Sequence, residues 1–402
     1  MSHETFLRRV KIRHYKSIGH CAVDLGPVTM LVGRNGSGKS NFLDALRFIA
    51  DGLQTSLDHA IKSRGGIDEV RRRSTGHPHN FAIELSFDVD EWNVATYAFE
   101  IGSIRKGGFT VKHESLKVVK PNGEALASYI VEEGGVQASL ATMPPAATDR
   151  LYLVSASGLP QFRPVYDALL SMGFYNLNPA QMKEFQSPDA GELLRRDGSN
   201  IASVIARLTD QRPEIKDRIK EYLRTIVPDI VDFSRVSFAH RETLEFKQDV
   251  KGSEHPWRFN AASMSDGTLR ALGVLVATTQ LVDPSHNVRL VGIEEPETAL
   301  HPAAAAALMD SLREASAHTQ VLVTTHSPDM LDRFDADTDV LLAVVSNQGT
   351  TEIGPVDSAS RETLKSQLYT AGELLRMDQL QPDPESVPLQ IEFAFDANGV
   401  GT

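Results

Sequence analysis

A glycine-rich segment near the N-terminus has the residue types that cradle phosphate. Glycine tolerates positive φ angles and lets backbone amides approach an anion with no Cβ in the way. A lysine and a hydroxyl at its end could pair with phosphate oxygens and with Mg²⁺, respectively. The segment fits G-x-x-x-x-G-K-[ST] through Gly33, Arg34, Asn35, Gly36, Ser37, Gly38, Lys39 and Ser40, and Asn41 follows it. The pattern predicts a phosphate loop (P-loop), the alternative being an accidental glycine-rich turn.

Three carboxylates follow an apolar stretch later in the chain. Residues 290–293 are Leu-Val-Gly-Ile, and Glu294, Glu295 and Glu297 come next. Carboxylates gathered at the end of a buried strand repel one another and lose part of their hydration. A bound cation would offset both costs. Mg²⁺ bound to nucleotide and to Ser40 would be that cation, with Glu294 holding its water shell. Glu295 would then orient or deprotonate an attacking water. The alternative is an exposed acidic turn after a core strand.

Two further polar groups stand where helices or strands are expected to end. Ser265, Asp266 and Gly267 precede an apolar helical pattern, and His326 follows a short apolar run. A helix start with exposed amides can bind an anion, although Ser and Asp also cap most helices. A lone histidine at a strand end is more often structural than catalytic. These groups follow the P-loop along the chain in a fixed order, and this order favours the functional interpretation.

The elements that must position these groups can be predicted from the hydrophobic pattern. Residues 28–32 are expected to form a buried strand leading into the P-loop, and residues 41–52 the helix that follows it. Strands and helices that alternate from residue 268 onward indicate a largely parallel sheet. The later segments are a helix at 268–281, a strand at 288–293, a helix opened by His301 and Pro302, and a strand at 321–324.

The remaining segments predict a strand-rich part and a helical part. Residues 10–12 and 22–25 read as short strands around a polar turn at 15–17, and residues 81–119 alternate as an antiparallel meander does. Residues 138–148 are rich in Ala and Pro and are expected to form a loose connection. Residues 162–223 show helical spacing, and strand-like runs return from 231. After about residue 378 the chain is rich in Pro, Asp and Gln, and we expect its last residues to fray.

Composition is typical of a soluble globular protein. The 402 residues are 41% hydrophobic and 23% charged, with a net charge of −12, so no global cationic field would hold nucleic acid or an anionic membrane. The single cysteine, Cys21, excludes an intrachain disulfide framework. No apolar run is long enough to span a bilayer, and the charged start does not resemble a secretory signal. We expect a cytoplasmic protein without a membrane partner.

Taken together, the motifs resemble a known family. The segments GRNGSGKS, SMSDGT, LVGIEEPETALHP and TTHSPDML are similar to the ABC-type ATPase heads of the SMC and RecF group. The similarity is greatest to stand-alone ATPases related to the overcoming-lysogenisation defence proteins. It extends to IRHYKSI, AIKSRGG, FYNLNP, RRDGSNIASVI and YTAGELL, and so covers nearly the whole chain.

The resemblance implies a fold, a reaction and a partner. The fold would be an α/β ABC-type head with a largely parallel core sheet, an antiparallel β-meander lobe and a helical lobe. Two heads would sandwich two ATP molecules with Mg²⁺, so that Ser265 and Gly267 serve the γ-phosphate held by Lys39 of the other subunit. Glu295 would be the catalytic base and His326 the γ-phosphate sensor. The parts would be an N-terminal lobe (1–150), a helical subdomain (151–230), a C-terminal lobe (231–380) and a tail (381–402), all of one composite head.

Some residues depart from the family pattern. Glu294 stands where Asp is commoner, and the signature begins Met264-Ser265-Asp266 rather than Leu-Ser-Gly. No residue is convincingly the glutamine that couples nucleotide to lobe movement, the candidates being Gln161, Gln181 and Gln186. The residue near 299–301 that would contact the opposite subunit is also not assigned.

Three functions remain open at this stage. The leading hypothesis is an ATPase switch that dimerises, or forms a higher homo-oligomer, around ATP and gates a separate effector in antiphage defence or the DNA damage response. No heptad pattern separates Lys39 from Ser265, and about 75 residues follow His326, too few for a Toprim nuclease domain. The second hypothesis is a nucleic-acid clamp that uses Arg71, Arg72, Arg73, Arg195 and Arg196, and the third is a scaffold held together by ATP. The same arginines could instead form a solvated charged face.

Overall fold

The computed structural model describes residues 5–74, 78–90, 92–280, 288–388 and 390–396. Its contacts divide the chain into two compact units. Unit 1 comprises residues 1–172, 340–363 and 378–402, and unit 2 comprises residues 173–339 and 364–377. The predicted division of the chain at residues 150, 230 and 380 stays a prediction.

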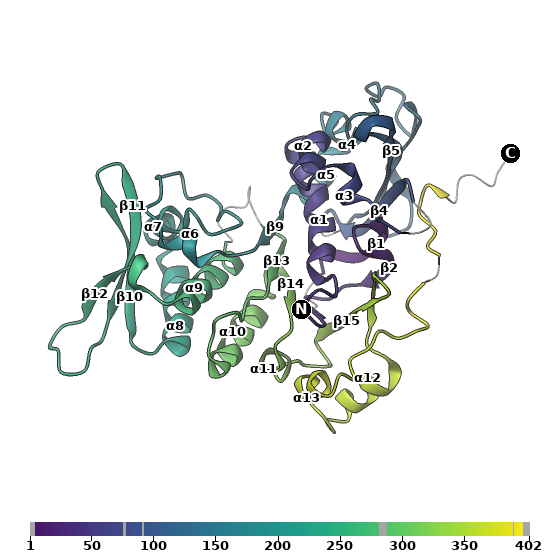
Figure 1. Cartoon of the computed structure of the whole chain (residues 1–402). Helices are drawn as coiled ribbons and strands as arrows, with labels where there is room; N and C mark the ends of the chain where they lie inside the picture. Colours follow the sequence, from purple (N-terminus) through teal and green to yellow (C-terminus); the bar gives the residue numbers. More distant parts are fainter. Residues whose placement is uncertain (1–4, 75–77, 91, 281–287, 389, 397–402) are drawn as a thin grey trace. The chain divides into compact units, whose positions relative to one another are not determined.

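Unit 1 is built on a mixed sheet with helices packed against it (Figure 1). Its strands run in the order β8-β7-β6-β5-β4-β1-β2-β16-β15-β3. The strands are β1 (Leu7–Tyr15), β2 (Ile18–Asp24), β3 (Val28–Val32), β4 (Asn80–Asp88), β5 (Val94–Ile104), β6 (Gly108–Val119), β7 (Ala125–Glu132), β8 (Gly135–Ala138), β15 (Asp339–Asn347) and β16 (Thr350–Pro355). The helices are α1 (Lys39–Gln54), α2 (Leu57–Lys62), α3 (Ile67–Val70), α4 (Tyr152–Ala156), α5 (Arg163–Leu170) and α12 (Ser358–Lys365), with a 3-10 turn at Arg105–Gly107.

The predicted meander is confirmed and extends further than the sequence pattern showed. Strands β4 to β8 pair antiparallel in chain order, and β1 pairs antiparallel with both β2 and β4. The α1 face of this sheet is apolar, and Tyr15, Phe48 and Phe81 meet there edge to face with ring centroids 5.4–5.9 Å apart. Residues 139–150 contain no helix or strand, as expected of a loose connection.

A buried carboxylate joins the meander to the helices that follow it. Glu114 on β6 is fully buried and accepts hydrogen bonds from the Tyr97 hydroxyl (3.0 Å) and the Tyr129 hydroxyl (2.8 Å). It also accepts from the first amides of α4, those of Tyr152 (2.5 Å) and Leu153 (2.8 Å). Burial raises the pKa of Glu114, and the four donors oppose that rise. The side chain thus caps α4 from a strand distant in sequence.

A two-residue turn sets the register of the β15–β16 hairpin. Asn347 pairs with Thr350, and between them Gln348 and Gly349 have φ angles of 49° and 78°. Two successive residues with positive φ are typical of a type I′ turn, which matches the twist of antiparallel strands. Strand β16 continues alongside β2, where Thr351 pairs in parallel with Ile18.

The segment after residue 378 is partly packed. Phe393 and Phe395 are buried against Ala82 and Ala98 of β4 and β5, on the face of the sheet away from α1. The Arg13 guanidinium lies 4.7 Å from the centre of the Phe393 ring. The last residues, for which fraying is predicted, lie outside the described part of the chain.

Unit 2 combines a parallel strand pair, a helical region and a second sheet (Figure 1). Strand β13 pairs in parallel with β14 and neighbours β9 on its other side. The second sheet has the order β10-β11-β12, and α7 and α8 pack against β10. The strands are β9 (Met172–Tyr175), β10 (Ile230–Phe238), β11 (Arg241–Gln248), β12 (Trp257–Asn260), β13 (Leu290–Glu294) and β14 (Gln320–Thr325). The helices are α6 (Pro179–Lys183), α7 (Ile201–Gln211), α8 (Pro213–Ile226), α9 (Asp266–Thr278), α10 (Pro302–Ala315), α11 (Pro328–Leu331) and α13 (Ala371–Arg376), with a 3-10 turn at Ala261–Ser263.

These elements confirm most of the local predictions for unit 2. The helix expected at 268–281 begins two residues earlier, because Ser265 caps it, and the predicted end at Leu281 lies outside the described residues. The helix expected to open at His301 and Pro302 is α10, and His301 caps it by accepting from the Ala303 amide (3.2 Å). Strand β9 was not predicted, since its four residues are too few for a pattern.

Candidate functional site

The P-loop lies in unit 1 between β3 and α1, the strand and helix predicted to flank it. Gly36 and Gly38 have φ angles of 79° and 106°, a backbone region open to glycine. Gly38 is the N-cap of α1, no side chain caps that helix, and its first turn carries no acidic residue. The amides at the start of α1 therefore present uncompensated positive partial charge.

Two of the glycines are also required by packing. A Cβ on Gly33 would lie 2.1 Å from the Val344 carbonyl oxygen of β15. A Cβ on Gly38 would lie 2.1 Å from the Thr351 hydroxyl of β16. The P-loop thus rests directly on two strands from near the C-terminal end of the chain.

A polar chain that the sequence did not reveal fastens the P-loop. The Thr351 hydroxyl donates to the Ser37 carbonyl (2.8 Å) and lies 2.7 Å from the Ser17 hydroxyl. Asn41 donates its side-chain amide to Ser17 (2.6 Å). Thr351 is 1% exposed. The network ties α1, the β1–β2 turn and β16 to the backbone of the loop.

The remaining groups of the P-loop fit a phosphate chain. The Lys39 amine donates to the carbonyls of Gly33 (2.8 Å) and Arg34 (3.1 Å), so it already lies along the loop. Within the described residues, the amides of Gly36, Gly38 and Ser40 have no acceptor, and the buried Ser37 hydroxyl has no partner. Asn35 and Ser40 are exposed, and Arg34 pairs with Asp378 (3.5 Å). Unsatisfied donors around a glycine cradle are the arrangement that binds an oligophosphate.

The predicted acidic residues lie in unit 2 at the end of β13. Glu294 is the last residue of the strand, and Glu295 follows with a φ of 44°, an uncommon angle for a side-chain-bearing residue. The Glu295 amide donates to the Thr324 carbonyl of β14 (3.0 Å), which holds this turn against the neighbouring strand. The Glu295 carboxylate lies 3.2 Å from Nδ1 of His326, so the structure brings these two predicted residues together.

The third acid, Glu297, has a structural position that the sequence did not assign. It is 8% exposed and accepts from the Thr325 hydroxyl (2.6 Å) and the His326 amide (3.4 Å). Burial raises its pKa, while these hydrogen bonds oppose the rise, and its second oxygen has no partner within the described residues. Glu297 therefore fixes the backbone from which His326 projects.

The Ser-Asp-Gly turn begins α9, also in unit 2. Ser265 caps the helix by accepting from the Thr268 amide (3.1 Å), and Asp266 pairs with Lys183 (2.6 Å). Gly267 is buried, and a Cβ there would lie 2.3 Å from the Ala299 carbonyl, so the turn packs against the loop that follows the acids. No acceptor for the Asp266 and Gly267 amides is found in the described part of the chain. Ser265 therefore does cap α9, and the Asp266 and Gly267 amides remain available to bind an anion.

Two arginines that were not predicted for this site lie beside the acids of unit 2. Arg196 pairs with Glu294 (3.1 Å), and Arg270 donates to the Glu295 carbonyl (3.5 Å). Burial lowers the pKa of Arg270, while the nearby Glu295, Glu297 and Asp266 act to raise it. Both arginines line a hollow of about 290 Å³ together with Asn176, Leu177, Asn178, Pro179 and Asp197. The motifs FYNLNP and RRDGSN, quoted above without a role, supply most of this lining.

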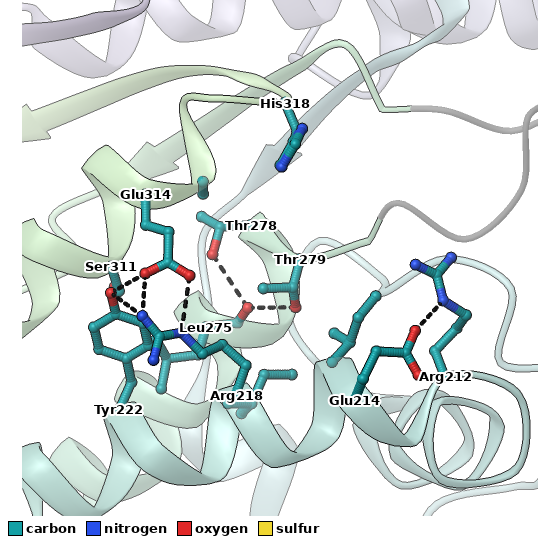
Figure 2. A pocket seen from close by; sticks show the side chains of 13 residues that line it. Arg212, Glu214, Arg218, Tyr222, Leu275, Thr278, Thr279, Ser311, Glu314 and His318 are labelled. Atoms are coloured by element: carbon teal, nitrogen blue, oxygen red, sulfur yellow. Dashed lines mark hydrogen bonds and ion pairs between the residues drawn. The ribbon is translucent and has the colours of Figure 1, made fainter.

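Other polar features of unit 2 serve packing or remain without an assigned role. Gln186, one of the coupling-glutamine candidates, is buried and accepts from the Ala202 amide (3.1 Å). Figure 2 shows a hollow of about 250 Å³ between α8, α9 and α10, where Glu314 meets Arg218 and Tyr222. None of the predicted site residues line it. The described residues contain no cluster of three or more His, Cys, Asp or Glu side chains arranged for a metal ion.

Comparison with known families identifies the chain. A family described as "AAA domain, putative AbiEii toxin, Type IV TA system" matches residues 28–100 and 173–332, more than half of the chain. The chain belongs to this AAA-domain family. The matched segments of the AAA domain contain the P-loop, the Ser-Asp-Gly turn, the acidic strand and His326. None of the curated proteins compared with the chain matches it.

Solved structures show the same fold as this AAA-domain protein. An SMC head bound to the C-terminal winged-helix domain of ScpA aligns over 89% of this chain and 99% of its own, with a TM-score of 0.54 and 16% identity. An SMC head with an extended coiled coil, bound to the C-terminal domain of ScpA and derived from Pyrococcus furiosus, aligns over 90% and 99%, with a TM-score of 0.52 and 13% identity. The predicted fold class, an α/β ATPase head with a meander and helices, is confirmed. No helix among the described residues is long and apolar enough to cross a membrane.

Proposed function

We propose that this AAA-domain protein is a Mg²⁺-dependent ATPase switch that dimerises around ATP and gates a separate effector. The observation that carries the proposal is the P-loop, with its uncapped helix, its amides that have no acceptor among the described residues, and its lysine already along the loop. Membership of the AAA-domain family supports the binding of ATP. Lys39 would pair the β- and γ-phosphates, the amides of Gly36 to Ser40 would bind phosphate oxygens, and Ser40 and Glu294 would hold Mg²⁺. Bound Mg²⁺ would neutralise part of the negative charge of the phosphates.

The hydrolytic step is assigned to the acids of unit 2. Glu295 would accept the proton of the attacking water, or orient that water, and His326 would hold the Glu295 carboxylate in place and sense the γ-phosphate. The 3.2 Å contact between them supports this pairing. Glu297 would keep His326 at its position through the Thr325 hydroxyl and the His326 amide.

The proposed dimer uses the start of α9. The Asp266 and Gly267 amides and the Ser265 hydroxyl would receive the γ-phosphate of a nucleotide bound by the other copy. ATP would thereby favour the dimer and hydrolysis would release it, as a ligand shifts any population toward the state that binds it better. The SMC heads described above were solved with a partner domain bound, a precedent for a separate partner here. The role in antiphage defence or DNA damage rests on the resemblance to the overcoming-lysogenisation group.

The nucleic-acid clamp is less well supported, because most of the arginines that motivated it are neutralised. Arg71 pairs with Asp68 (2.8 Å) and Arg73 with Glu69. Arg195 pairs with Asp189 (3.0 Å) and Arg196 with Glu294 (3.1 Å). These pairs match the solvated charged face considered above. For Arg72, the described residues provide no carboxylate partner.

Replacing Lys39 by alanine tests the proposed function. We expect Lys39→Ala to weaken ATP binding by at least about tenfold, because one charge-assisted contact to phosphate is lost, and to abolish turnover. Titration with a fluorescent ATP analogue and a phosphate-release assay measure the two effects. Lys62→Ala, which removes an exposed lysine of α2, is the matched control. Equal ATP affinity in Lys39→Ala and the wild type would refute the proposal.

Replacing Thr351 tests the fastening of the P-loop. Thr351→Val keeps the side-chain shape but removes the hydroxyl that donates to the Ser37 carbonyl and contacts the Ser17 hydroxyl. We expect ATP affinity to fall about tenfold, equivalent to about 1.4 kcal/mol, while Thr351→Ser retains it. Isothermal titration of the three proteins with ATP gives the comparison. If Thr351→Val binds as tightly as the wild type, the network does not position the loop.

A further inference from the structure

Three cationic or titratable side chains converge at the end of the β1–β2 hairpin in unit 1. The imidazole rings of His14 and His20 lie 5.1 Å apart between centroids. The Arg72 guanidinium donates to the Thr350 hydroxyl (2.5 Å) and lies against Gly19, where a Cβ would be 2.6 Å from Nη1. His14, His20 and Arg72 are called the hairpin cluster below.

The hairpin cluster lies on the opposite face of the sheet from the P-loop. Thr350 and Thr351 are consecutive on β16, so their side chains point to opposite faces. Thr351 reaches the P-loop, and Thr350 therefore contacts Arg72 on the other face. His20 on β2 lies directly opposite Arg13 on β1, so the two side chains are on the same face of the sheet. The Arg13 guanidinium covers Phe393 on the face away from α1. The hairpin cluster is thus separate from the proposed ATP site.

The charge of Arg72 is not compensated as that of its neighbours is. Arg71 and Arg73 each pair with an acid, whereas no carboxylate pairs with Arg72 within the described residues. Its Nε is buried and has no hydrogen-bond partner there. An unpaired buried donor of a guanidinium is costly, because a charged group has lost hydration without replacement.

The two histidines respond to the same positive surroundings. Burial lowers the pKa of His14 to about 4, with His20, Arg13 and Arg72 lowering it further and a hydrogen bond with the Asn80 backbone opposing them. Burial also lowers the pKa of His20, followed by Arg13 and Arg72. Arg13 shares its charge with Glu100 (3.0 Å) and Asp396 (3.3 Å), whereas no carboxylate among the described residues pairs with Arg72. His14 has a φ of 58°, an uncommon angle that recurs at ligand sites.

We propose that the hairpin cluster binds a phosphate group. The planar fork of Arg72 matches two phosphate oxygens, and a protonated His14 has a second N–H donor besides the one that it gives to the Asn80 backbone. A bound anion would compensate the Arg72 charge and would favour the protonated histidines. This site does not depend on the ATPase assignment, since its residues and its face of the sheet are different. The phosphate could be free or part of a nucleic-acid backbone, and the experiment separates these sources.

Histidine resonances in the full-length protein test the hairpin cluster directly. The C2–H signals of His14 and His20, assigned with His14→Gln and His20→Gln, are followed against pH without ligand, with inorganic phosphate, and with a short single-stranded DNA. We expect the ligand that binds to raise the pKa of both histidines by about one pH unit. A response to phosphate indicates a free phosphate ligand, and a response to DNA alone indicates a phosphodiester ligand.

Matched arginine variants decide whether the response belongs to the cluster. Arg72→Gln is expected to abolish the rise, and Arg71→Gln, which alters a neighbour paired with Asp68, to leave it unchanged. Arg72→Lys keeps the charge without the fork and should reduce the rise. It also serves as the test if Arg72→Gln does not fold. Unchanged titration of both histidines with each ligand, or an equal rise in the Arg72 variants, would overturn the proposal.

Discussion

Replacing Glu295 by glutamine is expected to lower ATP turnover by about 100-fold to 10,000-fold, the usual contribution of a general base, without weakening ATP binding. Glutamine has nearly the same shape but cannot take a proton from water. The turn that holds residue 295 depends on backbone bonds to Thr324, which the substitution leaves in place. The loss should therefore appear in turnover alone.

Three measurements on the Glu295→Gln protein give the comparison. A phosphate-release assay gives turnover, a fluorescent analogue gives ATP affinity, and sedimentation gives the mass with and without ATP. The switch predicts a long-lived ATP-bound dimer, since the step that releases it is blocked. Glu314→Gln, a change of the same kind on α10, should behave as the wild type in turnover. Wild-type turnover in Glu295→Gln would show that Glu295 is not the base. An ATP-dependent dimer in a wild-type protein that does not hydrolyse ATP would favour the scaffold.

Replacing Glu114 by glutamine is expected to destabilise unit 1 by about 3 kcal/mol, the scale of charge-assisted hydrogen bonds lost in a buried site. The two carboxylate oxygens accept four donors, from Tyr97, Tyr129, Tyr152 and Leu153. A glutamine amide turns one acceptor into a donor, which would face the amide or hydroxyl donors already there. The start of α4 would then lose its cap.

Denaturant unfolding followed by circular dichroism measures this effect. Glu132→Gln, an exposed glutamate on the neighbouring strand β7, should leave the midpoint unchanged. ATP affinity of the folded Glu114→Gln protein should match the wild type, since Glu114 serves the meander. A midpoint equal to that of the wild type would mean that the buried carboxylate contributes little net stability.

The sequence predicted those parts of the fold that depend on local pattern. The P-loop is predictable because its glycines and lysine must be consecutive, and the acidic strand end because an apolar run sits directly before the acids. The helix starts near Ser265 and at His301 are equally local, and both were found. Family membership and the SMC-head fold agree with that interpretation.

The residues that were missed act through contacts between distant segments. Thr351 is more than 300 positions from the P-loop carbonyl to which it donates, and a lone threonine in a strand carries no signal. Arg196 meets Glu294 from a loop about 100 positions away. Glu114 caps a helix from within a strand whose alternation suggested only packing. Such pairings arise from topology, which hydrophobic periodicity does not specify.

Strand β16 carries a further consequence through its turn. Gln348 and Gly349 fix which of two adjacent threonines faces the P-loop and which faces Arg72. One extra residue in this turn would shift the strand by one position and exchange their faces. The P-loop would then meet the Thr350 hydroxyl in place of the Thr351 hydroxyl. All the remaining side chains of β16 would move to the opposite face of the sheet. A single insertion in this turn, far from any reacting group, would therefore change the packing of the strand beneath the phosphate cradle while a threonine hydroxyl still reached the loop.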